Sequence, residues 1–229
     1  MVSATATATA GTATTHKHTE EEQCNEEPCN DEQFDEEHYD TEHAPLFDPE
    51  LLDAGVAAEH GVAARYVLRP LCRDDHDRGH AAVLAALSPG ALPRAAHRAR
   101  FAELQRWNAA HAAPGLYFVV VAAERATGRV VASATALVEH KFTHSAGRVA
   151  HIEDVAVHPA ARGRGLGTAL VALLVRLART HARCYKAVLC CAPARRAFYE
   201  HCGFVPLETE MVCPLLDAPS PPPVLDTEH

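Results

Sequence analysis

An acidic pair, Glu153-Asp154, lies a short way before a glycine loop in the stretch HIEDVAVHPAARGRGLG. The loop, Arg162–Gly167, has glycines that let an anion approach the backbone and arginines that add charge-assisted hydrogen bonds. A carboxylate would repel such an anion, but it can orient an amine and accept its proton. The spacing therefore predicts two sites, an anion-binding loop and a proton-accepting site, separated by the segment Val155–Val157.

The glycine loop alone is not decisive. It lacks the lysine and the serine or threonine of a nucleoside-triphosphate loop, and its glycine spacing differs from the dinucleotide fingerprint. A tight glycine turn with solvated arginines is an equally good interpretation of these six residues.

Regular elements are needed to position these groups, and the hydrophobic pattern predicts them. The expected order is strand, two helices, three antiparallel strands, helix, strand, helix and strand, which is a mixed α/β layer fold rather than a repeated parallel crossover. The ranges are strands 64–71, 115–124, 128–140, 148–157, 185–191 and 208–213, and helices 74–88, 93–110, 165–183 and 194–202.

Charge divides the chain unevenly. The net charge of −9 combines about −15 in residues 1–60 with about +6 in the remainder. The first 60 residues have few large apolar side chains, so we expect a disordered acidic extension. We assign residues 61–214 to one domain and 215–229 to a proline-rich tail, and the basic balance of the domain suits an anionic small molecule.

Nothing in the sequence reads as a signal peptide or a membrane span, so we expect a soluble, intracellular, cytoplasmic protein, with a peroxisome-like compartment left open. The eight cysteines are expected to be reduced. The spacing of Cys24 and Cys29 matches no trusted zinc pattern, so we expect no metal.

The glycine loop, placed between a strand and a long helix, resembles the pyrophosphate loop of acetyl-CoA-dependent N-acetyltransferases of the GNAT superfamily. AFYEHCGF is similar to the tyrosine-bearing helix and aromatic turn that close those domains. The resemblance covers residues 65–213. It implies the GNAT fold, a mixed central sheet flanked by helices, with acetyl-CoA as co-substrate.

Four stretches, VEHKFTHSAGRVAHIEDVAV, RGRGLG, CYKAVL and FYEHCGF, are similar to the glucosamine-6-phosphate N-acetyltransferase family. This resemblance implies transfer of acetyl to the 2-amine of glucosamine 6-phosphate, on the route to UDP-N-acetylglucosamine. It also implies a homodimer, with no nucleic-acid or membrane partner.

The resemblance also implies residue roles. Glu153, Asp154 and Tyr199 are the expected catalytic residues, with Tyr199 as general acid toward the coenzyme A thiolate; a tyrosine packed in the core is the alternative. The expected cofactor-binding residues are Val155, Ala156, Val157, Arg162, Gly163, Arg164, Gly165, Leu166, Gly167, Thr168, Arg195 and Tyr199. The expected substrate-binding residues are Ser88, Lys141, Phe142, Thr143, His144, Glu153, Asp154, Val155, Tyr185, Lys186 and Cys190.

The sequence departs from the family at two points: Cys190 stands where an acid is usual, and Arg195 where an asparagine is usual. One alternative that therefore stays open is an N-acetyltransferase acting on another amine, such as a polyamine, an antibiotic or a protein terminus. A second alternative, suggested by the long acidic extension, is a non-catalytic acyl-CoA-binding protein.

Overall fold

The computed structural model describes residues 43–88, 90, 92–111, 114–207, 209–211 and 213. The segment 1–42 and the tail 215–229 lie outside these residues, so the predictions for them are not tested. The elements in chain order are η1 (Pro49–Leu51), α1 (Gly55–Glu59), β1 (Tyr66–Pro70), η2 (His76–His80), α2 (Ala81–Leu84), α3 (Arg94–Ala110), β2 (Tyr117–Glu124), β3 (Val130–His140), α4 (Thr143–Ala146), β4 (Arg148–Val157), η3 (Pro159–Ala161), α5 (Leu166–Thr180), β5 (Lys186–Val188), η4 (Pro193–Arg195) and α6 (Arg196–His201).

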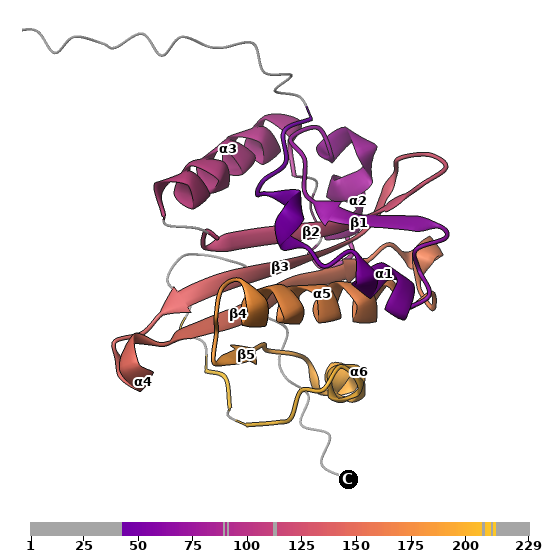
Figure 1. Cartoon of the computed structure of the whole chain (residues 1–229). Helices are drawn as coiled ribbons and strands as arrows, with labels where there is room; N and C mark the ends of the chain where they lie inside the picture. The colour runs from indigo at the N-terminus through magenta and orange to yellow at the C-terminus, as the bar shows by residue number, and fades with distance from the viewer. Residues whose placement is uncertain are drawn as a thin grey trace, which may run out of the picture. The chain divides into compact units, whose positions relative to one another are not determined.

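The core is a five-stranded sheet in the order β1-β2-β3-β4-β5. The first three pairings are antiparallel, and the last, between β4 and β5, is parallel. Helix α5 lies along the sheet against β3 and β4, α2 also contacts β3 and β4, α3 contacts β2, and α6 lies beyond β5 (Figure 1). The expected mixed sheet with flanking helices is confirmed.

Helix α5 is held by its apolar side. Its buried residues recur at helical spacing and include Leu166, Leu170, Leu173, Leu174 and Leu177. Each fully buried leucine contributes roughly 1.5–3 kcal/mol relative to exposure, so this face fixes the helix, and with it the helix N-terminus, on the sheet.

The boundary expected at residue 60 is wrong for residues 43–60. Leu46, Phe47 and Val56 are buried in the core, and Pro45 forms a bridge with Cys72. Arg176 of α5 also donates hydrogen bonds to Asp53 (2.8 Å) and Glu59 (2.7 Å). The acidic charge of this segment concealed a short apolar run that completes the core.

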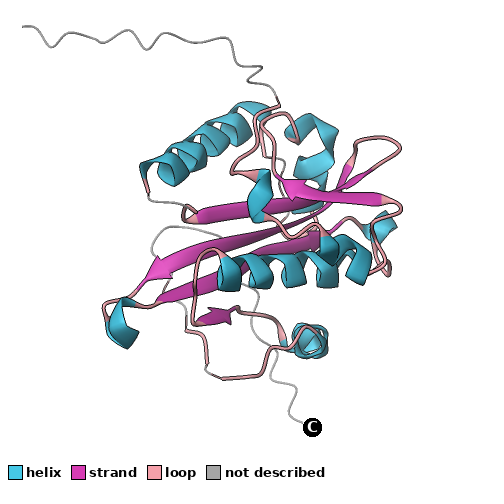
Figure 2. Cartoon of the chain, viewed as in Figure 1, coloured by secondary structure: helices cyan, strands magenta, loops and turns pink. Residues whose placement is uncertain are grey.

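Two other elements differ from expectation. The helix predicted over 74–88 begins as the π-helical turn η2, because Gly79 has a φ of 113° and a Cβ there would meet the Val130 carbonyl oxygen at 2.8 Å. The strand predicted over 208–213 is absent: among its described residues, Thr209–Met211 and Cys213 have no strand pairing, and no helix or strand follows α6 (Figure 2).

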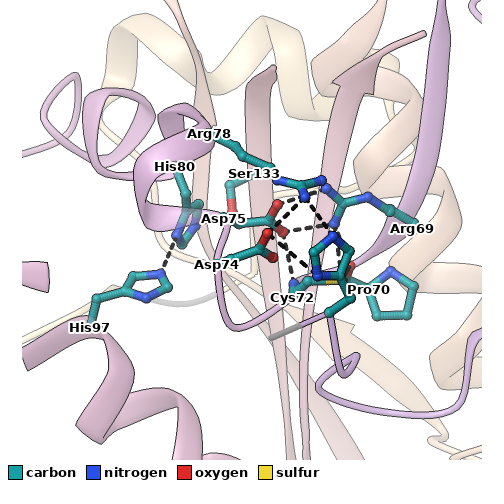
Figure 3. Close-up of polar contacts among 10 residues, drawn as sticks. Arg69, Pro70, Cys72, Asp74, Asp75, Arg78, His80, His97 and Ser133 are labelled. Carbon is teal, nitrogen blue, oxygen red and sulfur yellow. Dashed lines mark hydrogen bonds and ion pairs between the residues drawn. The ribbon is translucent and has the colours of Figure 1, made fainter. Parts of the chain in front are cut away.

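A polar network is buried under η2 and beside β3 (Figure 3). Arg69 donates two hydrogen bonds of 2.7 Å to Asp75, which is fully buried. His80 lies between His97 and Ser133, joined to them at 3.0 Å and 3.1 Å. These bonds satisfy groups that would otherwise cost free energy to bury, and they tie η2 and α3 to the centre of the sheet.

Candidate active site

A β-bulge in β4 exposes the two predicted carboxylates. Thr135 pairs with Glu153, but Ser133 pairs with Ala156, so two residues of β4 lie opposite a single residue of β3. Asp154 is one of them and has a φ of 52°, which is unusual for a residue with a side chain. A bulge bends its strand and redirects side chains. Glu153 and Asp154 are consequently both exposed, although they are neighbours on one strand.

Strands β4 and β5 pair only close to the hairpin that joins β3 to β4, and they separate beyond it. Their pairing extends only from Val149↔Lys186 to His151↔Val188. Beyond His151, the β5-facing edge of β4 has no strand partner among the residues that the structure describes. The predicted segment Val155–Val157 lies on this bare edge, whose backbone N–H and C=O groups can pair with an extended ligand.

The predicted anion loop lies where β4 gives way to α5. Gly163 and Gly165 have φ values of 74° and 77°, and Gly165 is the N-cap of α5 without a side-chain cap. The first N–H groups of the helix therefore have no side chain to accept their hydrogen bonds, which suits an anion. Leu166, the first residue of α5, has a buried side chain, so it can offer only its backbone N–H to an anion.

Three loop residues have contacts that the sequence did not suggest. Arg164 donates a 2.8 Å hydrogen bond to the hydroxyl of Tyr66, so in this structure it points toward β1. Arg162 is exposed, and its Nε atom donates a 3.3 Å hydrogen bond to the Val157 carbonyl oxygen. Gly167 faces Phe198: a Cβ would lie 3.1 Å from the ring. Gly167 thus allows α6 to approach α5, next to Thr168 and its neighbour Cys202.

Helix α6 carries Tyr199. Its ring packs edge-on against Phe198 at 4.9 Å and Phe204 at 6.2 Å. Burial, followed by the thiols Cys191 and Cys202, raises the pKa of the hydroxyl, while Arg195 lowers it. Tyr199 therefore remains protonated at neutral pH, as a proton donor must. The nearby Arg195 lies at the N-terminus of α6 and is exposed.

The other end of the bare edge is the β3–β4 hairpin. Glu139 accepts from Lys141 at 2.5 Å and pairs with His151 at 2.9 Å. Sequence reasoning missed Glu139, although its position near the end of the predicted strand, two residues before Lys141, was the available signal. The pair holds Lys141 at the hairpin and lowers the pKa of the Glu139 carboxyl.

Tyr185 and Lys186 join this end. The Tyr185 ring lies 4.5 Å from the His144 ring, and the Lys186 ammonium lies 5.9 Å from the Tyr185 ring centre. Gly147 leaves room for Tyr185, because a Cβ would come within 2.9 Å of it. His144 is held at a φ of 50°, a strained conformation often found at functional sites.

Three predicted residues are not brought into this arrangement. Phe142 is fully exposed and Thr143 is exposed beside it, so neither lines a pocket of its own chain. Ser88 is exposed beyond α2, and its described backbone contact is with Leu84.

Partial loss of hydration makes Glu153 a better base, although its side chain is exposed. It raises the pKa of the carboxyl, the charges of Asp154 and Glu210 raise it further, and His151 lowers it. Burial, followed by the charges of Asp154 and Glu153, raises the pKa of the Tyr117 hydroxyl on β2, and Arg100 lowers it. A carboxylate with a raised pKa accepts protons more readily near neutral pH.

Comparison with known proteins decides the family. The model of the acetyltransferase (GNAT) family matches residues 81–204, more than half of the chain. This chain belongs to the GNAT acetyltransferase family. The match runs from α2 through α6 and includes the bulge, the glycine loop and Tyr199.

Individual relatives are similar to this chain over most of their own length. Glucosamine 6-phosphate N-acetyltransferase 1 of Oryza sativa subsp. japonica is 45% identical over 159 residues, covering 69% of this chain and 92% of the relative. The Candida albicans protein of that name is 36% identical, covering 65% and 95%. The crystal structure of glucosamine-6-phosphate N-acetyltransferase from Arabidopsis thaliana has a TM-score of 0.59 at 28% identity, covering 65% and 97%.

GNAT enzymes use acetyl-CoA, and the bare edge of β4 with the uncapped start of α5 fits its pantetheine and pyrophosphate. Within the described residues, no three His, Cys, Asp or Glu side chains gather as a metal site would require. Likewise, no described helix is long and apolar enough to span a membrane.

Proposed function

We propose that this GNAT enzyme transfers the acetyl group of acetyl-CoA to the 2-amine of glucosamine 6-phosphate, giving N-acetylglucosamine 6-phosphate and CoA on the route to UDP-N-acetylglucosamine. The relatives named above support the substrate. The observation that carries the proposal is the position of Glu153, whose carboxylate is exposed at the bulge beside the bare edge of β4.

The anion loop and the strand edge hold the co-substrate in this proposal. Residues Gly163–Thr168 receive the pyrophosphate through backbone N–H groups, and Val155–Val157 pair with the pantetheine amides. Acetyl-CoA supplies its acetyl group as a thioester, whose carbonyl carbon the amine attacks. In this proposal Arg162 and Arg195 neutralise phosphate charge, whereas Arg164 donates a hydrogen bond to Tyr66.

The chain's own groups then move the proton. The amine attacks only when it is unprotonated, so Glu153, directly or through water, takes its proton, and Asp154 helps to orient the ammonium beforehand. Tyr199, protonated at neutral pH, donates its proton to the departing thiolate. General acid and base thus come from different elements, α6 and the bulge of β4.

The cationic hairpin end suits the sugar phosphate. We assign the phosphate to Lys186 and Lys141, with Tyr185 and His144 forming the wall beside them. The strand rises about 3.3 Å per residue, so the four-residue separation of Glu153 from Val149, the partner of Lys186, is about 13 Å of backbone. The Lys186 side chain can extend toward Glu153 and so reduce this backbone separation to the distance between the amine and the phosphate of the sugar.

A homodimer would give the exposed hairpin residues a role. Phe142 is fully exposed, and Leu137 and Tyr185 are also exposed large apolar side chains near the hairpin end. In this proposal Phe142 and Thr143 contact the site of the second subunit rather than their own. A chain of 24.7 kDa that runs at its monomer mass in light scattering would contradict the dimer.

Cys190 favours a second candidate, an acetyltransferase for another amine, because a thiol does not accept hydrogen bonds from a sugar as a carboxylate does. One assay separates the two candidates. Thiol release from acetyl-CoA is measured with glucosamine 6-phosphate, with unphosphorylated glucosamine and with a panel of other amines. We expect turnover with the phosphorylated sugar alone; its absence in a preparation that still binds acetyl-CoA would refute the first candidate.

A further inference from the structure

Cys190 lies at the point where β5 leaves β4. The parallel register that pairs His151 with Val188, continued by two residues, places Cys190 level with Glu153. Pairing has ended there, so the space between the two strands opens beside both residues. A ligand amine next to Glu153 would therefore also be next to Cys190.

A carboxylate from a distant part of the chain reaches this point. Glu210 follows α6 in the segment Thr209–Met211, and its side chain lies beside the Cys190 thiol; burial and this neighbouring carboxylate raise the pKa of the thiol. The thiol remains protonated, so it can donate to Glu210. A thiol is a weak donor, and a carboxylate has several acceptor positions, so Glu210 can still accept from a ligand.

Glu153 is surrounded by titratable groups from every neighbouring element. Asp154 and His151 share β4 with it, Tyr117 faces it from β2, Tyr199 from α6, Cys190 from the end of β5, and Glu210 from the last described segment. Asp154 and Glu210 are the anions of this group that oppose ionisation of Glu153. A cationic or hydroxyl-rich ligand would relieve this repulsion.

We propose that Glu210 is a second substrate-binding carboxylate, which accepts hydrogen bonds from the amino sugar between β4 and β5, opposite Glu153. The proposal rests on the proposed function, whose substrate offers hydroxyl and amine donors on adjacent carbons. The negative charge of Glu210 has a second effect, because it makes Glu153 a stronger proton acceptor. The segment after α6, which the sequence predicted to be a strand, thereby becomes part of the site.

The test compares Glu210→Gln with the full-length parent enzyme. Loss of a hydrogen bond to a charged group should raise the KM for glucosamine 6-phosphate about tenfold or more, with the KM for acetyl-CoA unchanged. Loss of the negative charge should also lower the pKa of Glu153, so the acid limb of the kcat/KM profile should move to lower pH. Glu103→Gln, an exposed carboxylate on α3, is the matched control and should leave both unchanged.

A rescue variant separates binding from simple fastening of the segment. Cys190→Asp in the Glu210→Gln background restores a carboxylate at the same point and should recover most of the sugar KM. The proposal is overturned if Glu210→Gln leaves the sugar KM and the acid limb unchanged. It is also overturned if both KM values rise together and Cys190→Asp rescues neither. No turnover by the parent enzyme would instead refute the proposed function, and Glu210 as a sugar ligand with it.

Discussion

The Nδ1 atom of His80 lies 3.0 Å from the Nε2 atom of His97, and both rings are buried. His80 belongs to η2 and His97 to α3, so this contact joins two elements across the interior (Figure 3). Burial, followed by the charge of His97, lowers the pKa of His80 to about 4. Burial also lowers the pKa of His97. The pair is accordingly neutral in the folded protein at neutral pH.

Acid should therefore destabilise the fold through His80. The unfolded chain binds a proton at an ordinary histidine pKa near 6.5, whereas the folded chain binds it only near 4. Stability from this group is full above pH 6.5 and is lost as the pH falls toward 4, by up to about 3 kcal/mol. Urea unfolding between pH 4 and 7 measures it. His80→Gln should flatten this part of the curve, and an unchanged slope would contradict the assignment.

Gly165→Ala should weaken acetyl-CoA binding by about tenfold or more. The reason is the backbone: at a φ of 77° a side chain is strained, and relief of that strain would turn the first N–H groups of α5 away from the anion. The Cβ itself would lie 3.6 Å from the His60 carbonyl oxygen, an ordinary contact, so no clash within the chain adds to this strain. Calorimetric titration with CoA gives the affinity.

Gly128→Ala is the control for that measurement. Gly128 has a similar φ of 70° in the β2–β3 turn and open space around it. Both variants should lose comparable stability, about 1 kcal/mol, but Gly128→Ala should bind CoA normally. Equal losses of CoA affinity in the two variants would show that the effect is global rather than local.

Two truncations should differ sharply. Removal of residues 1–42, a segment with few large apolar side chains, should leave turnover nearly unchanged. Removal of 1–60 also deletes Leu46, Phe47 and Val56 from the core, and should cost on the order of 5 kcal/mol of unfolding free energy. Thermal melts and turnover of both proteins measure this, and equal melting temperatures would contradict the core assignment.

The sequence predicted most of the fold because the central pattern is strongly periodic. β2, β3 and β4 are long apolar runs, and α5 carries leucines at helical spacing, so tertiary contacts and local preference agree. The failures occur where a tertiary contact overrides composition. The acidic charge of residues 43–60 concealed Leu46, and α3 buries His97, Phe101 and Leu104, whereas Trp107, three residues after Leu104, is 45% exposed.

The site was predictable only as separate motifs. HIEDVAV and RGRGLG are each contiguous, but the bulge at Asp154 depends on register with β3, which no single stretch encodes. Arg164 has the right type and spacing for a phosphate, yet the buried Tyr66 hydroxyl, almost a hundred residues away, takes its guanidinium. Glu210 reaches Cys190 only because the chain folds back after α6.

Tyr199→Phe should lower kcat about a hundredfold, because it removes the proton that the departing thiolate needs. The ring remains packed against Phe198 and Phe204, so the affinity for acetyl-CoA and the melting temperature should change little. Burial raises the pKa of the Tyr199 hydroxyl, so Tyr199 should stay protonated. The parent enzyme should therefore keep its activity up to at least pH 9. Steady-state kinetics from pH 6 to 10 on both proteins supply the comparison. A loss in kcat of less than threefold would reduce Tyr199 to a packing residue, and the thiolate would then leave with a proton from solvent.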